Sequence, residues 1–287
     1  MINEIEIRLP HTRVAAIVNY ESLSVIKPTL IFLHGYLDNA DSFATILPLL
    51  DEYQCIAIDM AGHGKSLHRS KDAHYHLSDY AYDLYQLVRT LQLSNFVLVG
   101  HSLGAIVSSL YASTQPKGLH GFIAIESCGP LSQDANTSAI QLTECFSSRT
   151  KANKPIKQPL SIEAVIKARC AISDLSASQA QQIVSRNLKT DKQGNLLWRS
   201  DNRLRTKSAL RMTEEQVCNT LANICCQRLL ILGKKGFEKI KVVIAKRDNI
   251  FFDVPTITFT GGHHVHLDSN VDVANCIHKY ATQFFER

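Results

Sequence analysis

The stretch Gly100-His101-Ser102-Leu103-Gly104 constrains the fold of this chain more than any other. The apolar run 96–99 leads into it, and a helical pattern of apolar residues follows it. This order predicts a buried strand, a sharp turn and a helix, with Ser102 at the tip of the turn. Such a turn admits only small neighbours, which explains the glycines two residues before and two after the serine. The hydroxyl would lie at a helix N-terminus, where free N–H groups favour developing negative charge.

Composition and charge are those of an ordinary globular protein. Of 287 residues, 45% are hydrophobic and 20% are charged, which suffices for a large core. The net charge of +5 is spread along the chain, so nucleic acid is a poor candidate partner. The sequence contains no apolar stretch of about 20 residues, so we expect no membrane span. The first residues do not resemble a secretory signal, and the eight cysteines form no Cys-x-x-Cys pair. These features predict reduced thiols and a cytoplasmic location.

Buried strands alternate with helical patterns in the first half of the chain. A hairpin is predicted at 5–18, followed by apolar strands at 28–33, 55–58, 96–99 and 122–125. Helical patterns cover 41–50 and 80–91. This alternation predicts a mainly parallel sheet of about eight strands, covered by helices on both faces. Ligands bind such sheets at the carboxyl ends of the strands, where His34, Asp59, Ser102 and Glu126 stand.

The strand signals disappear after residue 128 and return near residue 228. Between these points the sequence predicts helices around 139–148, 162–172, 177–187 and 214–224. Further strands are expected at 229–232 and 257–259, and a terminal helix follows them. We therefore predict a core formed by 1–128 and 228–287, with 129–227 inserted as a helical cap.

A serine nucleophile needs a base, and the base needs a carboxylate that orients it. His263 follows Gly261-Gly262 after the last predicted strand and is our candidate base. His264 and His266 are expected to pack or cap, and a metal site has little support there. Backbone N–H groups of Tyr36 and Leu103 are the candidate oxyanion hole.

The acid is the uncertain member of this set. The loop after 229–232 reads Gly233-Lys234-Lys235-Gly236 and offers no carboxylate. Glu126, at the end of the strand that follows the serine helix, is our preferred acid. Glu238 and Asp248 stay open as alternatives, as does a missing acid.

Three further residues are candidates for the substrate pocket: His34, His101 and Trp198. The more ordinary roles are a loop brace for His34 and a packing residue for His101. One competing motif, Gly64-Lys65-Ser66 after a strand, resembles the end of a phosphate-binding loop. That loop requires a glycine where Asp59 stands, so we exclude nucleotide binding. No cofactor and no metal are expected.

With these residues in view, the chain resembles the α/β-hydrolase superfamily over nearly its whole length. More narrowly, it resembles the serine hydrolase-like proteins in the motif 34–39, the serine turn, the stretch Trp198–Arg205 and the histidine loop 261–266. The resemblance implies Ser102 as nucleophile and His263 as base. Related dehalogenases carry a catalytic glutamate where Glu126 stands, but they use aspartate as nucleophile, as epoxide hydrolases do, so Ser102 excludes both reactions. Many relatives carry aspartate where this chain has Gly236, which affects only the acid.

These observations predict a serine hydrolase that cleaves a carboxylic ester of a small or medium-sized molecule. Thioester, amide or carbon–carbon bond cleavage and acyl transfer are the alternatives within catalysis. A hydrolase-fold protein that binds without turnover is the alternative outside it, because fold does not fix function. The substrate, the pathway and the oligomeric state do not follow from the sequence.

Overall fold

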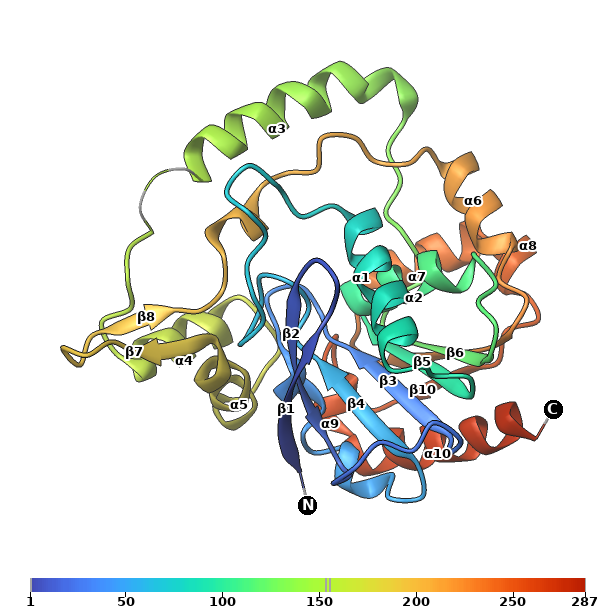
Figure 1. Cartoon of the computed structure of the whole chain (residues 1–287). Helices are drawn as coiled ribbons and strands as arrows, with labels where there is room; N and C mark the ends of the chain where they lie inside the picture. Colours follow the sequence, from blue (N-terminus) through green and yellow to red (C-terminus); the bar gives the residue numbers. More distant parts are fainter. Residues whose placement is uncertain (1, 153, 155, 287) are drawn as a thin grey trace.

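The computed structural model describes residues 2–152, 154 and 156–286 (Figure 1). Met1, Asn153, Pro155 and Arg287, which fall within the predicted core and cap, lie outside the described residues. One eight-stranded sheet forms the centre of the molecule. In spatial order its strands are β1 (Asn3–Arg8), β2 (Arg13–Val18), β4 (Gln54–Ile58), β3 (Thr29–Leu33), β5 (Phe96–His101), β6 (Leu119–Ile125), β9 (Gln227–Gly233) and β10 (Thr256–Phe259).

The strand directions confirm the mainly parallel sheet that the sequence predicts. The hairpin β1–β2 is antiparallel, and β2 pairs antiparallel with β4. Every other neighbouring pair in this sheet, from β4 to β10, is parallel. The carboxyl ends of β3, β5, β6, β9 and β10 therefore meet at one edge of the sheet.

Two hydrophobic layers sandwich the sheet, because alternate residues of a strand point to opposite faces. In β3, Leu30 and Phe32 pack toward α10 (Asn270–Phe285), which crosses the lower part of Figure 1. Ile31 and Leu33 pack in the layer that holds α1 (Leu77–Thr90) and α2 (Leu103–Ala112). Covered on both faces, the central strands are apolar throughout, which is why they read as solid hydrophobic runs.

The single helix expected at 41–50 is wrong. Two short 3₁₀ turns, η1 (Ala40–Phe43) and η2 (Leu47–Leu49), occupy this stretch instead. Pro48 supplies no backbone N–H and clashes with the preceding turn of an α-helix, so a continuous helix cannot pass through it. The apolar residues Phe43, Ile46 and Leu50 are still buried, which explains the helix-like pattern.

The chain between β6 and β9 is predominantly helical, and in Figure 1 it arches over and beside the sheet. It contains η3 (Ala135–Thr137), α3 (Ser138–Ala152), α4 (Ile162–Ala171), α5 (Ala177–Asn187), η4 (Asn202–Arg205) and α6 (Glu214–Ala222). It also contains a hairpin, β7 (Leu188–Thr190) and β8 (Leu196–Trp198), that we did not predict. Three-residue strands are too short to show an alternating pattern. We call this stretch, residues 126–226, the insertion.

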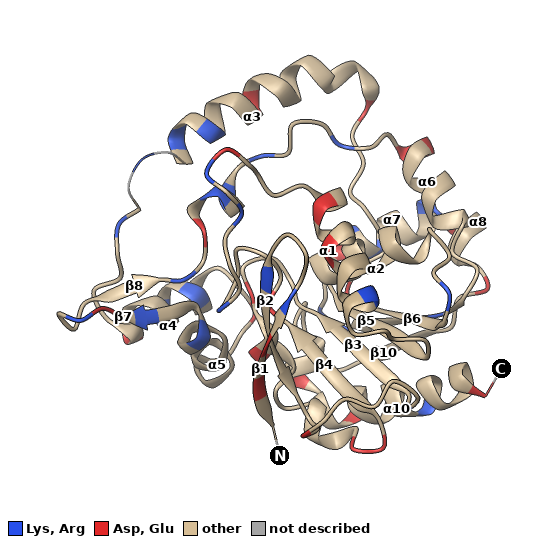
Figure 2. Ribbon diagram, viewed as in Figure 1, with Lys and Arg blue, Asp and Glu red and all other residues tan. Residues whose placement is uncertain are grey.

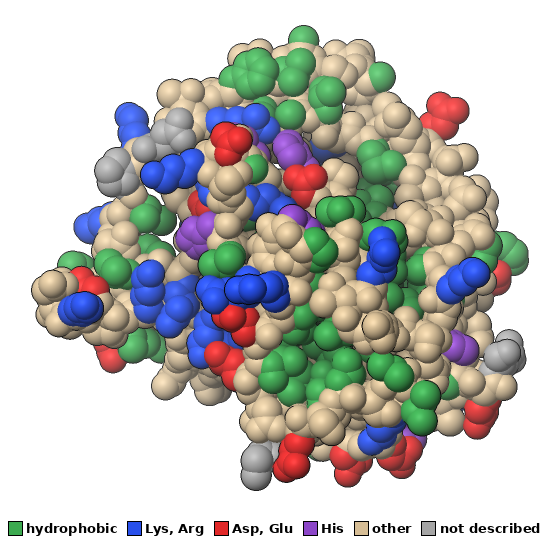
Figure 3. Space-filling model, in the orientation of Figure 1, with side chains coloured by type: hydrophobic (Ala, Val, Ile, Leu, Met, Phe, Trp, Pro, Cys, Tyr) green, Lys and Arg blue, Asp and Glu red, His purple; other side chains and the backbone are tan. Residues whose placement is uncertain are grey.

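Three further short helices are α7 (Glu238–Lys246) and α8 (Asp248–Phe251), between β9 and β10, and α9 (Val265–Asp268), after β10. Basic and acidic side chains are interspersed over the ribbon (Figure 2). On the face seen in Figure 3, exposed apolar side chains gather on α3, where Ile140 and Phe146 are more than half exposed. No helix in the described part of the chain combines the length and the hydropathy that a membrane crossing requires.

Candidate active site

Ser102 lies in the turn between β5 and α2, with its backbone at φ 49° and ψ −112°. A non-glycine residue with positive φ is strained, and such strain is held only by tight surroundings. The surroundings are tight here, since a Cβ on Gly104 would lie 2.0 Å from the Leu33 carbonyl oxygen. A Cβ on Gly100 would lie 2.4 Å from Cα of Ala105. Both glycines are therefore required for the turn that presents the serine.

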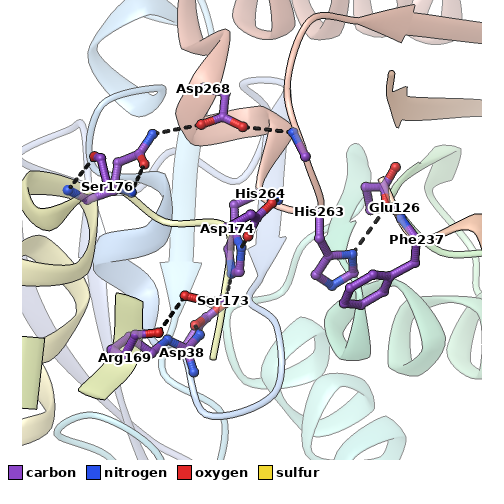
Figure 4. Close-up of polar contacts among 12 residues, drawn as sticks. Asp38, Glu126, Arg169, Ser173, Asp174, Ser176, Phe237, His263, His264 and Asp268 are labelled. Carbon is purple, nitrogen blue, oxygen red and sulfur yellow. Dashed lines mark hydrogen bonds and ion pairs between the residues drawn. The ribbon is translucent and has the colours of Figure 1, made fainter. Parts of the chain in front are cut away.

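His263 follows β10. Its imidazole is largely buried and points toward Glu126 (Figure 4). Its Nδ1 lies 3.2 Å from Oε2 of Glu126. The ring of Phe237 stacks on the imidazole with a centroid separation of 4.0 Å and an angle of 18°. Because the carboxylate holds Nδ1 and the phenyl ring holds the plane, the orientation of Nε2 is fixed. No pattern in the sequence pointed to Phe237.

Glu126 comes directly after β6, with a positive φ of 51° that turns its side chain along the edge of the sheet. Its Oε1 accepts a hydrogen bond of 2.8 Å from the N–H of Gly233, and its Oε2 accepts one of 3.2 Å from the N–H of Phe237. A Cβ on Gly236 would lie 2.1 Å from Oε1. The carboxylate of Glu126 thus fills the space beside the loop after β9.

Neither of the two alternative acids contacts His263. Glu238 begins α7 with its side chain 78% exposed, and it pairs with Lys241 at 3.0 Å. Asp248 begins α8 and is exposed. Of the three carboxylates considered from the sequence, only Glu126 contacts His263.

Ser102 and His263 line one cavity of about 550 Å³ together with Glu126. Its other walls come from α2, the segment after β6, and α7 with the residue before it. They are mostly apolar and include Ile106, Leu131, Phe237, Ile240 and Val243. No hydrogen bond joins Ser102 to His263 in the described structure. Such bonds are often longer before substrate binds.

The two candidate oxyanion-hole donors flank Ser102. Leu103 is the first residue of α2, and Tyr36 belongs to the tight loop after β3 that closes with a 3.1 Å bond from Asp38 N–H to the Gly35 carbonyl. Among the described residues, neither N–H donates a backbone hydrogen bond. The Tyr36 hydroxyl donates a hydrogen bond of 3.2 Å to the carbonyl oxygen of Leu204, which connects this loop to the insertion.

The three candidate pocket residues have different positions. His34 is fully buried, its Nε2 accepts from the Met60 N–H at 3.0 Å, and burial lowers its pKa to about 4. It braces the loop and lines neither cavity beside Ser102, which corrects its assignment as a substrate contact. Trp198 lines a separate cavity of about 400 Å³ between α4, α5 and β8, so it too is corrected. Its placement depends on the packing of the insertion. His101 borders a second cavity of about 660 Å³ next to Ser102.

A buried polar network that we did not predict occupies the other side of His263. The imidazole of His264 lies between two carboxylates, at 2.6 Å from Asp174 and 3.3 Å from Asp38. Arg169 contacts the second oxygen of Asp38 at 2.5 Å. Figure 4 shows this chain of contacts running from the insertion to the histidine loop. Asp174 and Arg169 belong to the insertion, so these contacts hold the insertion against the core. No local sequence pattern could have indicated the network, because its residues are far apart in the chain.

Charge and burial set the protonation of this network. Burial alone would lower the pKa of His264, but its hydrogen bonds to Asp174 and Asp38 raise it to about 9. Burial raises the pKa of Asp38, yet the bond to His264 and the charge of Arg169 outweigh it and hold that pKa well below its usual range. Burial, with the nearby histidines, lowers the pKa of His101 well below its usual value. His264 is therefore a cation and His101 is neutral at pH 7.

Comparisons with known proteins agree with the fold. A family model described as the alpha/beta hydrolase fold matches residues 28–158. A probable serine hydrolase of Drosophila melanogaster is 31% identical over 261 residues, covering 84% of this chain and 77% of that protein.

Solved structures give the same result. The crystal structure of a hypothetical protein from Pseudomonas aeruginosa PAO1 is 31% identical, covers 99% of both chains and has a TM-score of 0.86. A thioesterase domain from the curacin biosynthetic pathway is 21% identical, covers 96% of this chain and 99% of that one, and has a TM-score of 0.80. The relatives support a hydrolase. The chain therefore belongs to the α/β-hydrolase superfamily, and within it the chain is similar to the serine hydrolase-like proteins.

Proposed function

We propose that this protein is a serine hydrolase that cleaves a carboxylic ester through an acyl-enzyme. The observation that carries the proposal is the 3.2 Å contact between His263 Nδ1 and Glu126, in a cavity that Ser102 also lines. A nucleophile, a base and an orienting carboxylate are the parts that this chemistry requires.

In the proposed mechanism, Glu126 accepts a hydrogen bond from Nδ1–H of His263 and so leaves Nε2 with a free lone pair. Nε2 takes the proton of the Ser102 hydroxyl as the oxygen attacks the ester carbonyl. The alcohol leaves with that proton, and His263 then activates a water that attacks the acyl-enzyme and releases the acid. Glu126 stabilises the imidazolium formed in both halves of the reaction.

The N–H groups of Tyr36 and Leu103 would receive the negative charge that develops on the carbonyl oxygen. Both lack a backbone acceptor in the described structure, and Leu103 stands at the N-terminus of α2. Preorganised donors of this kind stabilise the tetrahedral intermediate without reorganisation.

The shape of the cavity supports an acyl group of medium size. Its volume of about 550 Å³ falls within the range of pockets that bind small molecules. Because its walls on the α7 side are mostly apolar, we assign the acyl chain to that side. The second cavity, which Lys235 and Arg169 line, would receive the more polar leaving group.

A thioester is the second candidate substrate. The likeness to the curacin thioesterase domain favours it, since the same three groups cleave either bond. Paired substrates that differ only in oxygen or sulfur at the leaving group would rank the two by kcat/KM.

The reason to consider binding without turnover is that the loop after β9 contains no carboxylate. The contact between Glu126 and His263 weakens that reason, because a carboxylate reaches the histidine from β6 instead. An activated serine reacts rapidly with a fluorophosphonate probe, whereas a serine without a base does not.

The test compares probe labelling of the wild type, Ser102→Ala and Ser127→Ala. Ser127 lines the same cavity and is the matched control. We expect rapid labelling of the wild type and of Ser127→Ala, and none of Ser102→Ala. If the folded wild type reacts no faster than Ser102→Ala with either the fluorophosphonate or a small acetyl ester, the proposal is wrong and the non-catalytic alternative holds.

A further inference from the structure

We propose that Asp38, His101 and His264 form a binding site for a divalent transition metal ion, with Zn²⁺ as the best-fitting ion. One oxygen of Asp38 and one ring nitrogen of each histidine lie within 4.8 Å of one another, and all three residues are buried. The inference concerns binding, and it does not depend on the proposed hydrolysis.

His101 offers a nitrogen that has no partner among the described residues. Its Nε2 lies 2.9 Å from the carbonyl oxygen of His263, so Nε2 carries the proton and donates it there. The other nitrogen, Nδ1, is then a lone pair, and this fully buried atom makes no hydrogen bond. It lies 3.8 Å from Oδ2 of Asp38, so a lone pair faces a carboxylate. A cation between the two atoms would turn this repulsion into two bonds.

His264 has the second arrangement that metal-binding histidines share. Its Nδ1 is held by the Asp174 carboxylate at 2.6 Å, while its Nε2 points to Oδ2 of Asp38 at 3.3 Å. Histidine ligands of metals generally donate their other ring N–H to a carboxylate or a backbone carbonyl, which fixes the ring. His264 has the carboxylate and His101 has the carbonyl. Metal binding would release the proton that Nε2 shares with Asp38.

Gly35 leaves the space between the ligands open. A Cβ at this position would lie 2.8 Å from Oδ2 of Asp38 and also 2.8 Å from Nδ1 of His101. Any side chain at this position would therefore crowd both ligand atoms, and only glycine keeps the approach to them clear. The residues also border the cavity of about 660 Å³, through which an ion can enter and water or substrate can complete the coordination.

The charges around the three ligands allow a dication. Asp38 and Asp174 carry two negative charges, and Arg169, which contacts the other oxygen of Asp38, carries one positive charge. Once the proton of His264 Nε2 has been released to the solvent, both histidines are neutral and the cluster is net negative. Two imidazoles, one carboxylate and an open position are a ligand set typical of Zn²⁺, whereas Ca²⁺ and Mg²⁺ prefer oxygen ligands alone.

The test uses the full chain with Ser102→Ala, so that hydrolysis plays no part. The protein is stripped with a chelator and titrated with ZnCl₂ by calorimetry, and with CoCl₂ by visible absorption. We expect one ion per chain, and a cobalt spectrum of nitrogen and oxygen ligands without the charge-transfer band of a thiolate. The thiolate band matters because Cys225 is exposed.

Two variants and one control locate the ion. His101→Gln keeps a donor for the His263 carbonyl but removes the lone pair, and Asp38→Asn removes the carboxylate. Each should weaken binding about a hundredfold or more. His278→Gln changes an exposed histidine that also pairs with a carboxylate, Glu52 at 2.9 Å, and it should leave binding unchanged.

A measurement on the unsubstituted ligands covers the case in which a variant fails to fold. Nitrogen-15 spectra of the histidine side chains should show Nδ1 of His101 and Nε2 of His264 shifting on addition of one equivalent of Zn²⁺. The proposal fails if no stoichiometric ion binds, if the ion is thiolate-ligated, if folded His101→Gln binds as tightly as its parent, or if these two nitrogens do not shift.

Discussion

His263 and His264 are neighbours in one loop, and both meet carboxylates, but their surroundings give them opposite properties. His263 contacts one carboxylate, Glu126, and borders the cavity that Ser102 lines. His264 lies between two carboxylates, Asp38 from the core and Asp174 from the insertion. Among the described residues, Nε2 of His263 has no hydrogen-bond partner, whereas both ring nitrogens of His264 contact carboxylates.

The difference shows that partners decide what a histidine can do. With a pKa raised to about 9, His264 holds its proton at pH 7 and cannot act as a base. His263 has only Nδ1 occupied, so Nε2 is available to a substrate or to Ser102. Histidine is therefore a candidate base at position 263, whereas at position 264 it links the insertion to the core through ion pairs.

Removal of the Glu126 carboxylate should have the largest effect. In Glu126→Gln, the amide can present an N–H where Oε2 stood and so favour the wrong tautomer of His263. We expect the rate of ester hydrolysis to fall on the order of 10³- to 10⁴-fold, as when triad acids are removed elsewhere. Steady-state kcat/KM measures it.

Glu238→Gln is the matched control for this change, because Glu238 lines the same cavity but does not contact His263. It should alter kcat/KM less than tenfold. Equal losses in the two variants, or a loss only in Glu238→Gln, would transfer the role of acid away from Glu126.

Moving the acid from β6 to the loop after β9 should have an intermediate effect. A Cβ on Gly236 would lie 2.1 Å from Oε1 of Glu126, so Gly236→Asp alone should clash and lose activity. In Glu126→Gly/Gly236→Asp, the clash disappears and the new carboxylate starts beside the vacated position. We expect a gain of about ten- to a hundredfold in kcat/KM over Glu126→Gly alone. A double variant no better than the single one would show that only β6 can supply the acid.

The fold and the three candidate residues of the triad could be predicted because their signals are local. A buried strand reads as an apolar run, and the serine turn requires Gly100 and Gly104 for steric reasons visible in five residues. Glu126 could be chosen because it ends the strand beside the serine strand. Its contact with His263 is now a structural fact, while its catalytic role stays a prediction.

What the sequence could not provide depends on packing between distant segments. Asp174 meets His264 across 90 positions and Arg169 meets Asp38 across 131, with no pattern that links them. The position of Trp198, a candidate pocket residue, depends on how it packs with α4 and α5, which the sequence does not show. The prediction of a helix at 41–50 was wrong because Phe43, Ile46 and Leu50 are buried at helix-like spacing although the chain forms two 3₁₀ turns.

Loss of the Asp174 carboxylate should destabilise the protein rather than the chemistry. In Asp174→Asn, the imidazolium of His264 loses its 2.6 Å charged partner, and the fastening of the insertion to the core weakens. Hydrogen bonds to charged groups contribute about 2 kcal/mol to the free energy of unfolding, so we expect a loss of that size. Urea unfolding measures it. Asp51→Asn, at an exposed position, is the control, and an equal loss there would contradict a specific role for Asp174.

The smallest effect on stability should come from removing the ion pair between Glu214 and Arg247. The bond to Arg247 lowers the pKa of Glu214 from 4.5 to about 2, outweighing the effect of burial, and joins α6 to α8. A lowered pKa in the folded state contributes stability that is complete above pH 4.5 and is lost as the pH falls through 2. Glu214→Gln should therefore lower the free energy of unfolding by about 1 kcal/mol at pH 7, since the pair is partly solvent-screened, and should have no such effect near pH 2.

Thermal unfolding at the two pH values measures the difference, with Glu215→Gln, the exposed neighbour in α6, as the control. A deficit that persists undiminished at pH 2 would mean that Glu214 stabilises the helices through packing instead of charge.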